Sequence, residues 1–484
     1  MPTRAAMPES WNALRACCLL ALTLIFVPPL RAAGPAARNP QIDAVVAAIS
    51  QQRIEARIRK LASFHTRHTL SRTDSESHGI GAARRWIQAE LDQCARATGG
   101  RLQVALDSYR EAPGRRVPLE VEIVNVVATL PGSQAGAADR IYVVSGHYDS
   151  RASDVMDAEA HAPGANDDAS GVAAVMELAC VMAAHRFDAT LVFMAVAGEE
   201  QGLLGSAHWA EEASRKGLAV AGMITNDIIG SPTGPDGRRD ERRVRLFASG
   251  LPALLAAWQR GGSEFAQRAL QDLADIARSG GEADTPAHQL GRHLKEAGER
   301  YLPGFVVDLN PRPDRFLRGG DHLPFLARGY AAVRFTEPLE DYRHQHQNVR
   351  VENGVQFGDL PEFVDFGYVA QVTRVNGAGL ASLALAPAAP RDAGIEVVEL
   401  ENDTTLRWTA NDEPDLAGYR IVWRAPGMLT WQFARNAGNV TRFTLKGVSK
   451  DDYLFGVIAL DRDGNASPAS FPRPWRPGQG PGPR

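Results

Sequence analysis

Residues 140–150 read RIYVVSGHYDS, a short apolar run that ends in a histidine and an aspartate. The stretch TLVFMAVAGEE (190–200) repeats this arrangement and ends in two glutamates, and AGMITND (221–227) ends in an aspartate. Short apolar runs bounded by glycine and polar residues are typical of buried strands. We therefore predict three buried strands, each with acidic or histidine side chains at its carboxyl end.

Helical patterns separate these runs throughout residues 37–386. Two further apolar runs, GFVVDL (304–309) and AAVRFTE (331–337), lie in the second half of this region. Strands that alternate with helices indicate an α/β fold, here a three-layer sandwich with a mostly parallel central sheet. We interpret the charged, helix-favouring segment 231–303 as a cap-like insertion into this fold.

Beyond the linker APAAP (386–390) the pattern changes, and no helical pattern follows. Alternating segments such as GYRIVWRA (418–425) are separated by turn-forming clusters, which is typical of a β-sandwich. We predict an all-β sandwich over residues 387–473, and this part resembles a fibronectin type III domain. Residues 474–484 are rich in proline and glycine and are predicted to be a disordered tail.

The amino terminus has the features of a secretory signal. Arg4 and Arg15 precede an apolar run at residues 16–30, which is followed by small residues around Ala33. A charged start, an apolar stretch of about 7–15 residues and a small-residue end are typical of signal peptides. We therefore predict a signal peptide over residues 1–33 and an exported protein, periplasmic or extracellular. Because the apolar run is shorter than the roughly 20 residues that a span needs, we predict no membrane span.

The overall charge and the cysteines narrow the class of protein further. The 53 basic and 57 acidic residues nearly balance, which argues against nucleic acid as a partner. Once the signal is removed, the chain keeps Cys94 and Cys180. Export permits a disulfide between them, but both lie in helical patterns, and we favour two buried free thiols.

Histidine and acidic residues gather where the predicted strands end. In open α/β sheets, ligands bind at the carboxyl ends of the strands, so these side chains should lie at one edge. The loop GANDDASG (164–171) lies between the first two strands and adds further carboxylates. Mixed histidine and carboxylate ligands suit Zn²⁺, and an excess of carboxylates indicates two metal ions about 3.5–4 Å apart. The candidate residues at this edge are His147, Asp149, Asp167, Glu199, Glu200, Asp227, His344 and His346.

The same motifs resemble those of the M28 family of zinc aminopeptidases, which use two co-catalytic metal ions. The matching segments follow the family's order and lie between Leu61 and Leu385. They are HYDS (147–150), GANDDASGVAAVMELA (164–179), AGEEQGLLGS (197–206), Asn226-Asp227 and GGDHLPF (319–325). The resemblance implies a zinc-peptidase fold, two zinc ions per chain, and an enzyme that removes N-terminal residues from peptides with a free N-terminus.

The resemblance also implies which residues hold the zinc ions. One ion would be held by His147 and Asp227, and the other by Glu200 and His344. Asp167 would bridge the two ions.

Other residues would support the reaction. Glu199 would act as the general base, which takes a proton from a metal-held water and passes it to the leaving amine. Adjacent residues at a strand end point to different sides, so one glutamate can ligate while its neighbour faces the water. Asp149 would orient His147 through a hydrogen bond. Asp321 and His322 of GGDHLPF would support the metal pocket.

Two positions depart from the family pattern. The family's last zinc ligand is usually a histidine with an acidic or polar residue four positions later, which favours His344, since Asn348 follows it. His346 remains the alternative ligand. Some members place a tyrosine directly before this histidine to stabilise the oxyanion. Here that position is Arg343, with Tyr342 one residue earlier, and both are candidate oxyanion donors.

Two other functions are compatible with parts of this pattern. A glutaminyl cyclase shares the fold, keeps one zinc ion and cyclises N-terminal glutamine, whereas the full ligand set here favours hydrolysis. A non-catalytic, peptidase-like binding protein typically loses ligands that this chain retains. The predicted β-sandwich lacks histidine and cysteine. We expect this module to bind polymeric substrate or a surface rather than to take part in the reaction.

Overall fold

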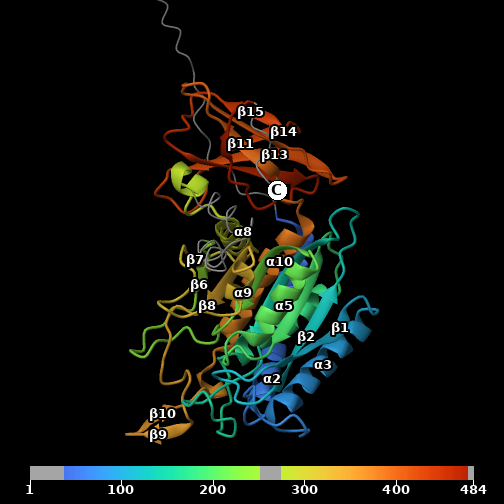
Figure 1. The fold of residues 1–484 in the computed structure, drawn as a ribbon, viewed down its shortest axis with the longest axis vertical. Coiled ribbons are helices and arrows are strands. Elements are labelled where there is room, and N and C mark those ends of the chain that lie inside the picture. Colours follow the sequence, from blue (N-terminus) through green and yellow to red (C-terminus); the bar gives the residue numbers. More distant parts are fainter. Residues whose placement is uncertain (1–37, 251–273, 478–484) are drawn as a thin grey trace, which may run out of the picture.

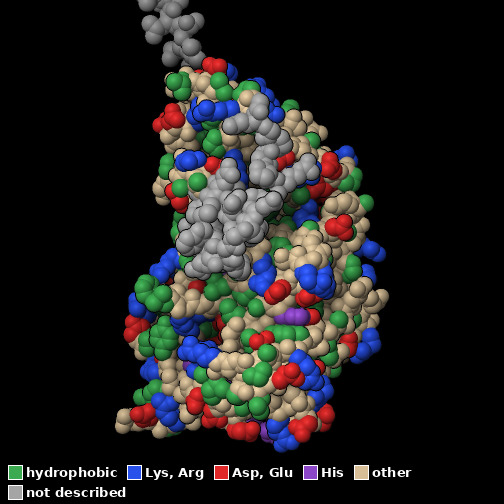
Figure 2. All heavy atoms as spheres, viewed as in Figure 1, with side chains coloured by type: hydrophobic (Ala, Val, Ile, Leu, Met, Phe, Trp, Pro, Cys, Tyr) green, Lys and Arg blue, Asp and Glu red, His purple; other side chains and the backbone are tan. Residues whose placement is uncertain are grey.

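The computed structural model describes residues 38–250 and 274–477, and Figure 1 shows a layered α/β body with an all-β body beyond it. The predicted signal peptide at residues 1–33 lies outside the described residues. Within the two described ranges, no helix is both long and apolar enough to cross a membrane. On the face seen in Figure 2, basic and acidic side chains are mixed, in keeping with their near balance in the sequence.

A large sheet of eight strands forms the middle layer, in the order β1-β2-β4-β3-β5-β8-β6-β7. Its centre is parallel, since β4, β3, β5 and β8 run in the same direction. The pairs β1–β2, β2–β4 and β6–β8 are antiparallel, and β6–β7 is parallel. The strands are β1 (Gln103–Glu111), β2 (Val121–Leu130), β3 (Arg140–His147), β4 (Thr190–Val196), β5 (Ala219–Asn226), β6 (Arg243–Phe247), β7 (Val306–Asn310) and β8 (Ala332–Thr336).

The predicted apolar runs are confirmed as strands β3, β4, β5, β7 and β8. The structure adds β1, β2 and β6, which the sequence analysis did not identify. Along β1 the residues are exposed or half-buried, so this strand has no continuous apolar run that periodicity could detect. Its antiparallel pairing with β2 lets one face meet solvent, which removes the need for such a run.

Helices cover both faces of the sheet and complete the three layers. Along β3, Tyr142 and Val144 point into one apolar core and Val143 into the other, because successive strand residues alternate. The first core includes side chains from α1, α2, α3, α4, α8 and α10, and the second includes side chains from α5 and α9. The bounds are α1 (Pro40–Ala48), α2 (Gln51–Ala62), α3 (Gly79–Ala97), α4 (Ala169–Met182), α5 (Leu204–Arg215), α8 (Pro286–Tyr301), α9 (His322–Leu326) and α10 (Phe366–Leu385).

The segment 231–303, expected as a cap-like insertion, contributes to the layered body itself. Strand β6 pairs with β7 and β8 in the central sheet, and α8 buries Leu290 and Leu294 in the core. Residues 251–273 of this segment lie outside the described residues. Many of its charged residues lie instead in the largely exposed stretch 236–243, which leads into β6.

The C-terminal body consists of two sheets, β15-β12-β11-β17 and β14-β13-β16. Side chains from both sheets, among them Trp408 and Trp423, pack into one apolar core. Two all-β sheets are therefore confirmed, while the likeness to fibronectin type III stays a prediction. Trp475, which falls within the predicted tail 474–484, lies in β17 and stacks with Arg407, and residues 478–484 lie outside the described residues. The strands are β11 (Arg391–Glu396), β12 (Thr404–Thr409), β13 (Leu416–Arg424), β14 (Phe433–Gly438), β15 (Arg442–Leu445), β16 (Leu454–Asp461) and β17 (Arg473–Trp475).

Three buried charged residues join the two bodies, and we call them the junction triad. Asp284, just before α8, lies between Arg292 of α8 and Arg424 of β13, at 2.9 Å and 2.5 Å from their guanidinium nitrogens. All three side chains are at most 2% exposed. The ring of Trp431 lies beside both arginines. Charges buried this deeply require partners, so the two bodies are held in a defined arrangement.

A disulfide links Cys94 of α3 to Cys180 of α4. The prediction of two free thiols is therefore wrong. The two helices pack side by side and bring the Cα atoms to 5.2 Å, although 86 residues separate the cysteines in the sequence. Helical patterns locate each cysteine on its own helix but say nothing of which helices become neighbours. A disulfide persists in oxidising compartments, which is compatible with the predicted export.

Candidate metal centre

The candidate residues converge at the carboxyl edge of the parallel strands. His147 is the last residue of β3, Glu199 and Glu200 follow β4, and Asp227 follows β5. Asp167 comes from the loop that leads into α4. Neighbouring parallel strands end at the same edge of the sheet, so the strand order β4-β3-β5 brings these side chains together.

His147, Asp167 and Asp227 form the first cluster, which we call the inner group. The Nε2 atom of His147 lies 3.1 Å from Oδ1 of Asp167 and 3.9 Å from Oδ1 of Asp227. The three ligand atoms lie within 4.8 Å of one another, close enough to hold one metal ion. The inner group is almost completely buried.

Asp167, Glu200 and His346 form the second cluster, which we call the outer group. The Nε2 atom of His346 lies 2.9 Å from Oδ2 of Asp167 and 3.0 Å from Oε1 of Glu200. The His346 side chain is 32% exposed, so this group lies nearer to solvent. Asp167 belongs to both groups, and its two oxygens face different histidines. A carboxylate in this position can bridge two metal ions.

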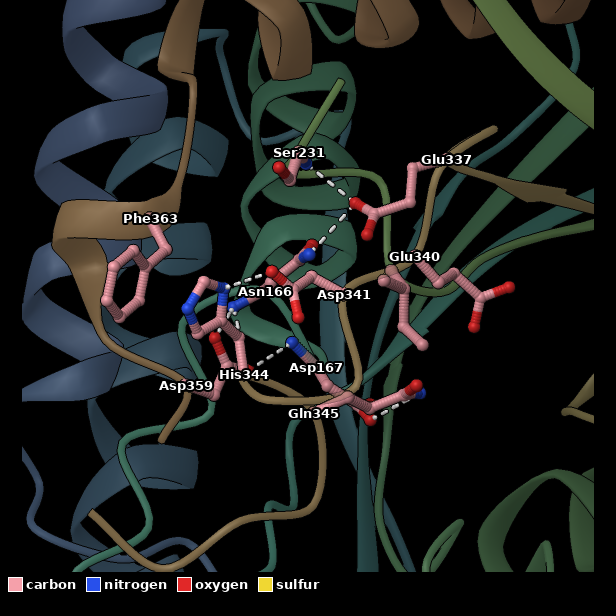
Figure 3. Close-up of a pocket in the computed structure, with 11 residues that line it drawn as sticks. Asn166, Asp167, Ser231, Glu337, Glu340, Asp341, His344, Gln345, Asp359 and Phe363 are labelled. Carbon is pink, nitrogen blue, oxygen red and sulfur yellow. Dashed lines mark hydrogen bonds and ion pairs between the residues drawn. The ribbon is translucent and has the colours of Figure 1, made fainter. Parts of the chain in front are cut away.

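The expectation for the last histidine is corrected here. His344, which we favoured, stacks on Phe363 with ring centroids 3.6 Å apart, as Figure 3 shows, and belongs to neither group. The alternative, His346, lies in the outer group instead. The backbone at His346 is left-handed, with φ of 51°, and this turn brings its ring to Asp167. The spacing to Asn348 matched the family pattern at the wrong histidine, because a local turn cannot be seen in spacing.

The two groups fit a pair of divalent metal ions. Among the described residues, Nε2 of His147 and Oε1 of Glu200 are buried and make no hydrogen bond of normal geometry, although the first lies 3.1 Å from Asp167 and the second 3.0 Å from His346. Buried polar atoms without partners are costly, and a metal ion would satisfy both. The donors are imidazole nitrogens and carboxylate oxygens, which suit Zn²⁺.

The electrostatics of the centre reflect an excess of carboxylates. Burial raises the pKa of Glu199 well above its usual range, and the charges of Asp227 and Glu200 add to this effect. Burial opposes a charge on His346, but Glu200 and Asp167 outweigh it and raise the pKa of His346 to about 10. A bound cation would reverse these shifts, since it favours ionised carboxylates and neutral imidazoles.

Asp149 connects the ends of β3 and β4, and Nδ1 of His147 lies 3.2 Å from its backbone oxygen. Its Oδ1 atom lies 3.5 Å from Nδ1 of His147. Its carboxylate also accepts hydrogen bonds from the backbone of Glu199 and Glu200, at 3.3 Å and 3.1 Å, and from Thr69 Oγ1 at 3.0 Å. Asp149 therefore positions a histidine of the inner group and the two glutamates at once.

Two aspartates that sequence reasoning did not assign hold the Asp167 loop. Asp168 accepts hydrogen bonds from the backbone of His147 at 3.0 Å and of Gly171 at 2.9 Å, and so caps α4. Asp359 accepts from the backbone of Asn166 and Asp167. The sequence indicated a capping role for Asp168, because it directly precedes a helical pattern. No sequence pattern pointed to Asp359, which lies 192 residues from Asp167.

The pocket beside Asp167 is drawn in Figure 3. Its wall includes the stacked rings of His344 and Phe363 and several carboxylates. Glu337 accepts hydrogen bonds from Asn166 Nδ2 at 2.9 Å and from the Ser231 backbone at 2.6 Å. Glu337, which directly follows β8, therefore joins the Asp167 loop to the segment after β5 at this pocket.

The remaining candidates lie around the centre in different settings. Asp321 and His322 are buried at the start of α9, and burial raises the pKa of Asp321 to about 7. Arg343 is paired with Asp341, and Tyr342 is 60% exposed and lies beside Arg318. Both oxyanion candidates thus have other partners, and their role stays a prediction.

Arg334 of β8 was missed, although the sequence carried a signal for it. It is fully buried and lies 3.0 Å from Oδ1 of Asp227. A charged residue inside an apolar strand is rare unless it is paired, so the arginine in AAVRFTE pointed to a buried acidic partner. Gln345 was also missed, and its Nε2 atom lies 3.3 Å from Oδ2 of Asp167.

Comparison with known proteins identifies relatives of the whole chain. The profile of peptidase family M28 matches residues 125–245. A probable zinc metalloprotease of Leptosphaeria maculans is 46% identical over 438 residues, which cover 90% of this chain and 98% of the relative. A second, from Pyrenophora teres f. teres, is 44% identical over 440 residues, 91% and 88% of the two chains. The crystal structure of LapB from Legionella pneumophila aligns with a TM-score of 0.48 at 18% identity, over 72% of this chain and 75% of that chain.

Proposed function

The chain belongs to the zinc metalloproteases of peptidase family M28, and from this premise we propose that it is an exported aminopeptidase with two zinc ions. Its substrates are peptides with a free N-terminus. One observation carries the two-ion proposal, namely that the two oxygens of Asp167 face His147 and His346 separately. A single-ion site would need only one of these groups.

In this proposal the inner ion is held by His147, Asp167 and Asp227, and the outer ion by Asp167, Glu200 and His346. When bound, such a pair of ions lowers the pKa of a water and polarises the scissile carbonyl. The greater exposure of His346 supports entry of the substrate from the outer side.

Glu199 is the general base in this scheme. It is half-buried beside the inner group, where a carboxylate can take a proton from water and return it. Glu199 accepts the proton of the attacking water and donates it to the departing amine. Its backbone is held by Asp149, which limits the movement of the side chain.

We propose that the C-terminal sheets bind polymeric substrate or a surface, outside the reaction itself. Two features support a role outside the reaction. The C-terminal sheets follow every proposed metal ligand in the sequence, and they contain no histidine or cysteine. The junction triad fixes them to the layered body, so that binding there would place the metal centre at a constant position relative to the bound surface.

The test combines metal analysis with peptide assays on the purified full-length protein. We expect about two zinc ions per chain, and release of free amino acids from peptides with free but not acetylated N-termini. A chelator should abolish the release and added zinc should restore it. A peptide that begins with glutamine separates the two enzyme classes, since a cyclase would liberate ammonia without any amino acid. That result, or hydrolysis of acetylated peptides alone, would overturn the proposal.

A further inference from the structure

Arg334 is an unusual residue for a central strand. It lies in β8 between Val333 and Phe335, and all three are fully buried. A buried guanidinium requires partners for its charge and its hydrogen-bond donors. The identity of these partners shows what the residue does.

The guanidinium group connects a metal-ligating aspartate to a second carboxylate. Its Nη2 atom lies 3.0 Å from Oδ1 of Asp227, and its Nη1 atom lies 2.9 Å from Oδ2 of Asp314. The same Nη1 atom donates to the backbone oxygen of Gly319 at 2.5 Å. With partners on both sides, the planar guanidinium has little freedom to turn.

The chain leaves space for this contact at Gly320. A Cβ atom there would lie 3.0 Å from Nη1 of Arg334 and 3.2 Å from Oδ2 of Asp227. Contacts that short are tighter than side chains normally make. The glycine therefore lets the backbone approach the Arg334–Asp227 pair on the side of the second aspartate oxygen.

We infer that Arg334 is a positioning residue for the inner metal ion. It holds Oδ1 of Asp227 in an ion pair at 3.0 Å and so determines how the carboxylate presents itself to the ion. This inference rests on the proposed two-zinc function and deepens it. Partners of metal ligands fix the ligand's orientation, and their loss typically lowers metal affinity about 10- to 100-fold.

The two metal groups differ in this respect. For Glu200 of the outer group, the guanidinium of Arg151 lies farther away, at 3.9 Å from Oε2. The Arg151 side chain is also 15% exposed, whereas that of Arg334 has no exposed surface. Loss of Arg334 should therefore weaken the inner group selectively, and the affinity for the outer ion should stay unchanged.

In the experiment, zinc is titrated into metal-free full-length protein and the heat of binding is measured. In a separate titration, Co²⁺ is added and its visible absorption is recorded. Arg334→Met removes both the positive charge and the planar guanidinium with its two terminal nitrogens. Arg334→Lys keeps the positive charge but not the planar group. We expect about 10- to 100-fold weaker binding of one of two ions in both variants, with a changed cobalt spectrum for that ion. Arg292→Met is the matched control, since it breaks a buried Arg–Asp pair of the junction triad. It should lower Tm but leave both affinities unchanged.

Three outcomes would overturn the inference. The first is wild-type metal affinity in both Arg334 variants. The second is an equal loss of affinity for both ions together with a lower Tm. The third is tighter metal binding in Arg334→Met, which would show that repulsion between the arginine charge and the ion outweighs positioning. If Arg334→Met does not fold, Arg334→Lys alone decides between these results. Fewer than two bound zinc ions in the wild-type protein would instead overturn the proposed function.

Discussion

The junction triad and the metal centre both bury several charged groups, but in opposite ways. In the triad, one aspartate lies between two arginines, and each charge has a partner within 2.9 Å. In the metal centre, the carboxylates outnumber the nearby cationic side chains, and burial raises the pKa of Glu199 and of Asp321. Paired charges hold two bodies together, whereas an excess of one sign creates a site that is completed by a cation or by protons.

The largest effect should follow from Glu199→Gln, which tests the functional side of this comparison. The variant removes the general base and spares all ligands, so kcat should fall about 10²- to 10⁴-fold while the metal content stays constant. Peptide hydrolysis and metal analysis of the same sample provide the measurement. Glu211→Gln, at a mostly exposed position of α5, is the control and should leave kcat unchanged. Full activity in Glu199→Gln would rule out its role as the base.

Asp284→Asn tests the structural side. It leaves Arg292 and Arg424 buried without a counter-ion, which should lower the free energy of unfolding by about 3–5 kcal/mol. Urea denaturation measures this loss, and zinc content should not change, because the triad shares no residue with the metal groups. Asp412→Asn removes an exposed partner of Arg391 and should cost less than about 1 kcal/mol. A stable Asp284→Asn variant would show that the triad does not hold the bodies together.

Replacing the two histidines one at a time sharpens the assignment of the outer group. His346→Ala removes a proposed ligand atom and should lower the affinity for one zinc ion by at least roughly 100-fold. Loss of a residue that only supports a ligand lowers metal affinity by about 100-fold at most. His344→Ala removes a ring that stacks on Phe363 and should leave both zinc affinities intact. Zinc titration of both metal-free variants decides the matter. If His344→Ala loses a zinc ion and His346→Ala does not, then His344 is the ligand, as the sequence analysis favoured.

The smallest effect concerns Asp188, an acid in a solvent-open cavity that is lined by residues of both bodies. Burial, with Asp415 and Asp461 nearby, raises the pKa of Asp188 to about 6, above the 3.8 of a free side chain. The folded state therefore binds this proton more tightly, and stability falls as the pH rises from about 4 to 6.

Asp188→Asn should remove that penalty. After allowance for solvent screening at this half-buried site, the gain is about 1 kcal/mol at pH 8 and close to zero at pH 4. Urea denaturation at the two pH values measures the difference. An equal gain at both pH values would mean that the effect is not electrostatic.

Much of the fold and of the centre could be predicted because the relevant signals are local. The apolar runs that became β3, β4 and β5 are each followed by a candidate ligand or base, and these side chains lie together at one sheet edge. Asp149 was likewise expected beside His147, and both lie in a single tetrapeptide. Such residues are brought together by the strand order alone, which parallel α/β folds share.

Several of the failures involve contacts between distant segments. The disulfide depends on the packing of α3 against α4, and β6 joined the sheet although its surroundings looked like an insertion. Asp359 reaches the Asp167 loop from 192 residues away. Neither spacing nor periodicity contains information on such neighbours, because both describe one element at a time.

The order of the amino acids was sufficient to predict the layered α/β body, the β-rich C-terminal body and most of the side chains that gather in the two candidate metal-binding groups. Those features follow from periodicity and from the residue that ends each strand. Folding in three dimensions selected His346 over His344, paired Cys94 with Cys180 and set Arg334 against Asp227. These outcomes depend on distances of a few ångströms between separate elements, which are set when the elements pack together.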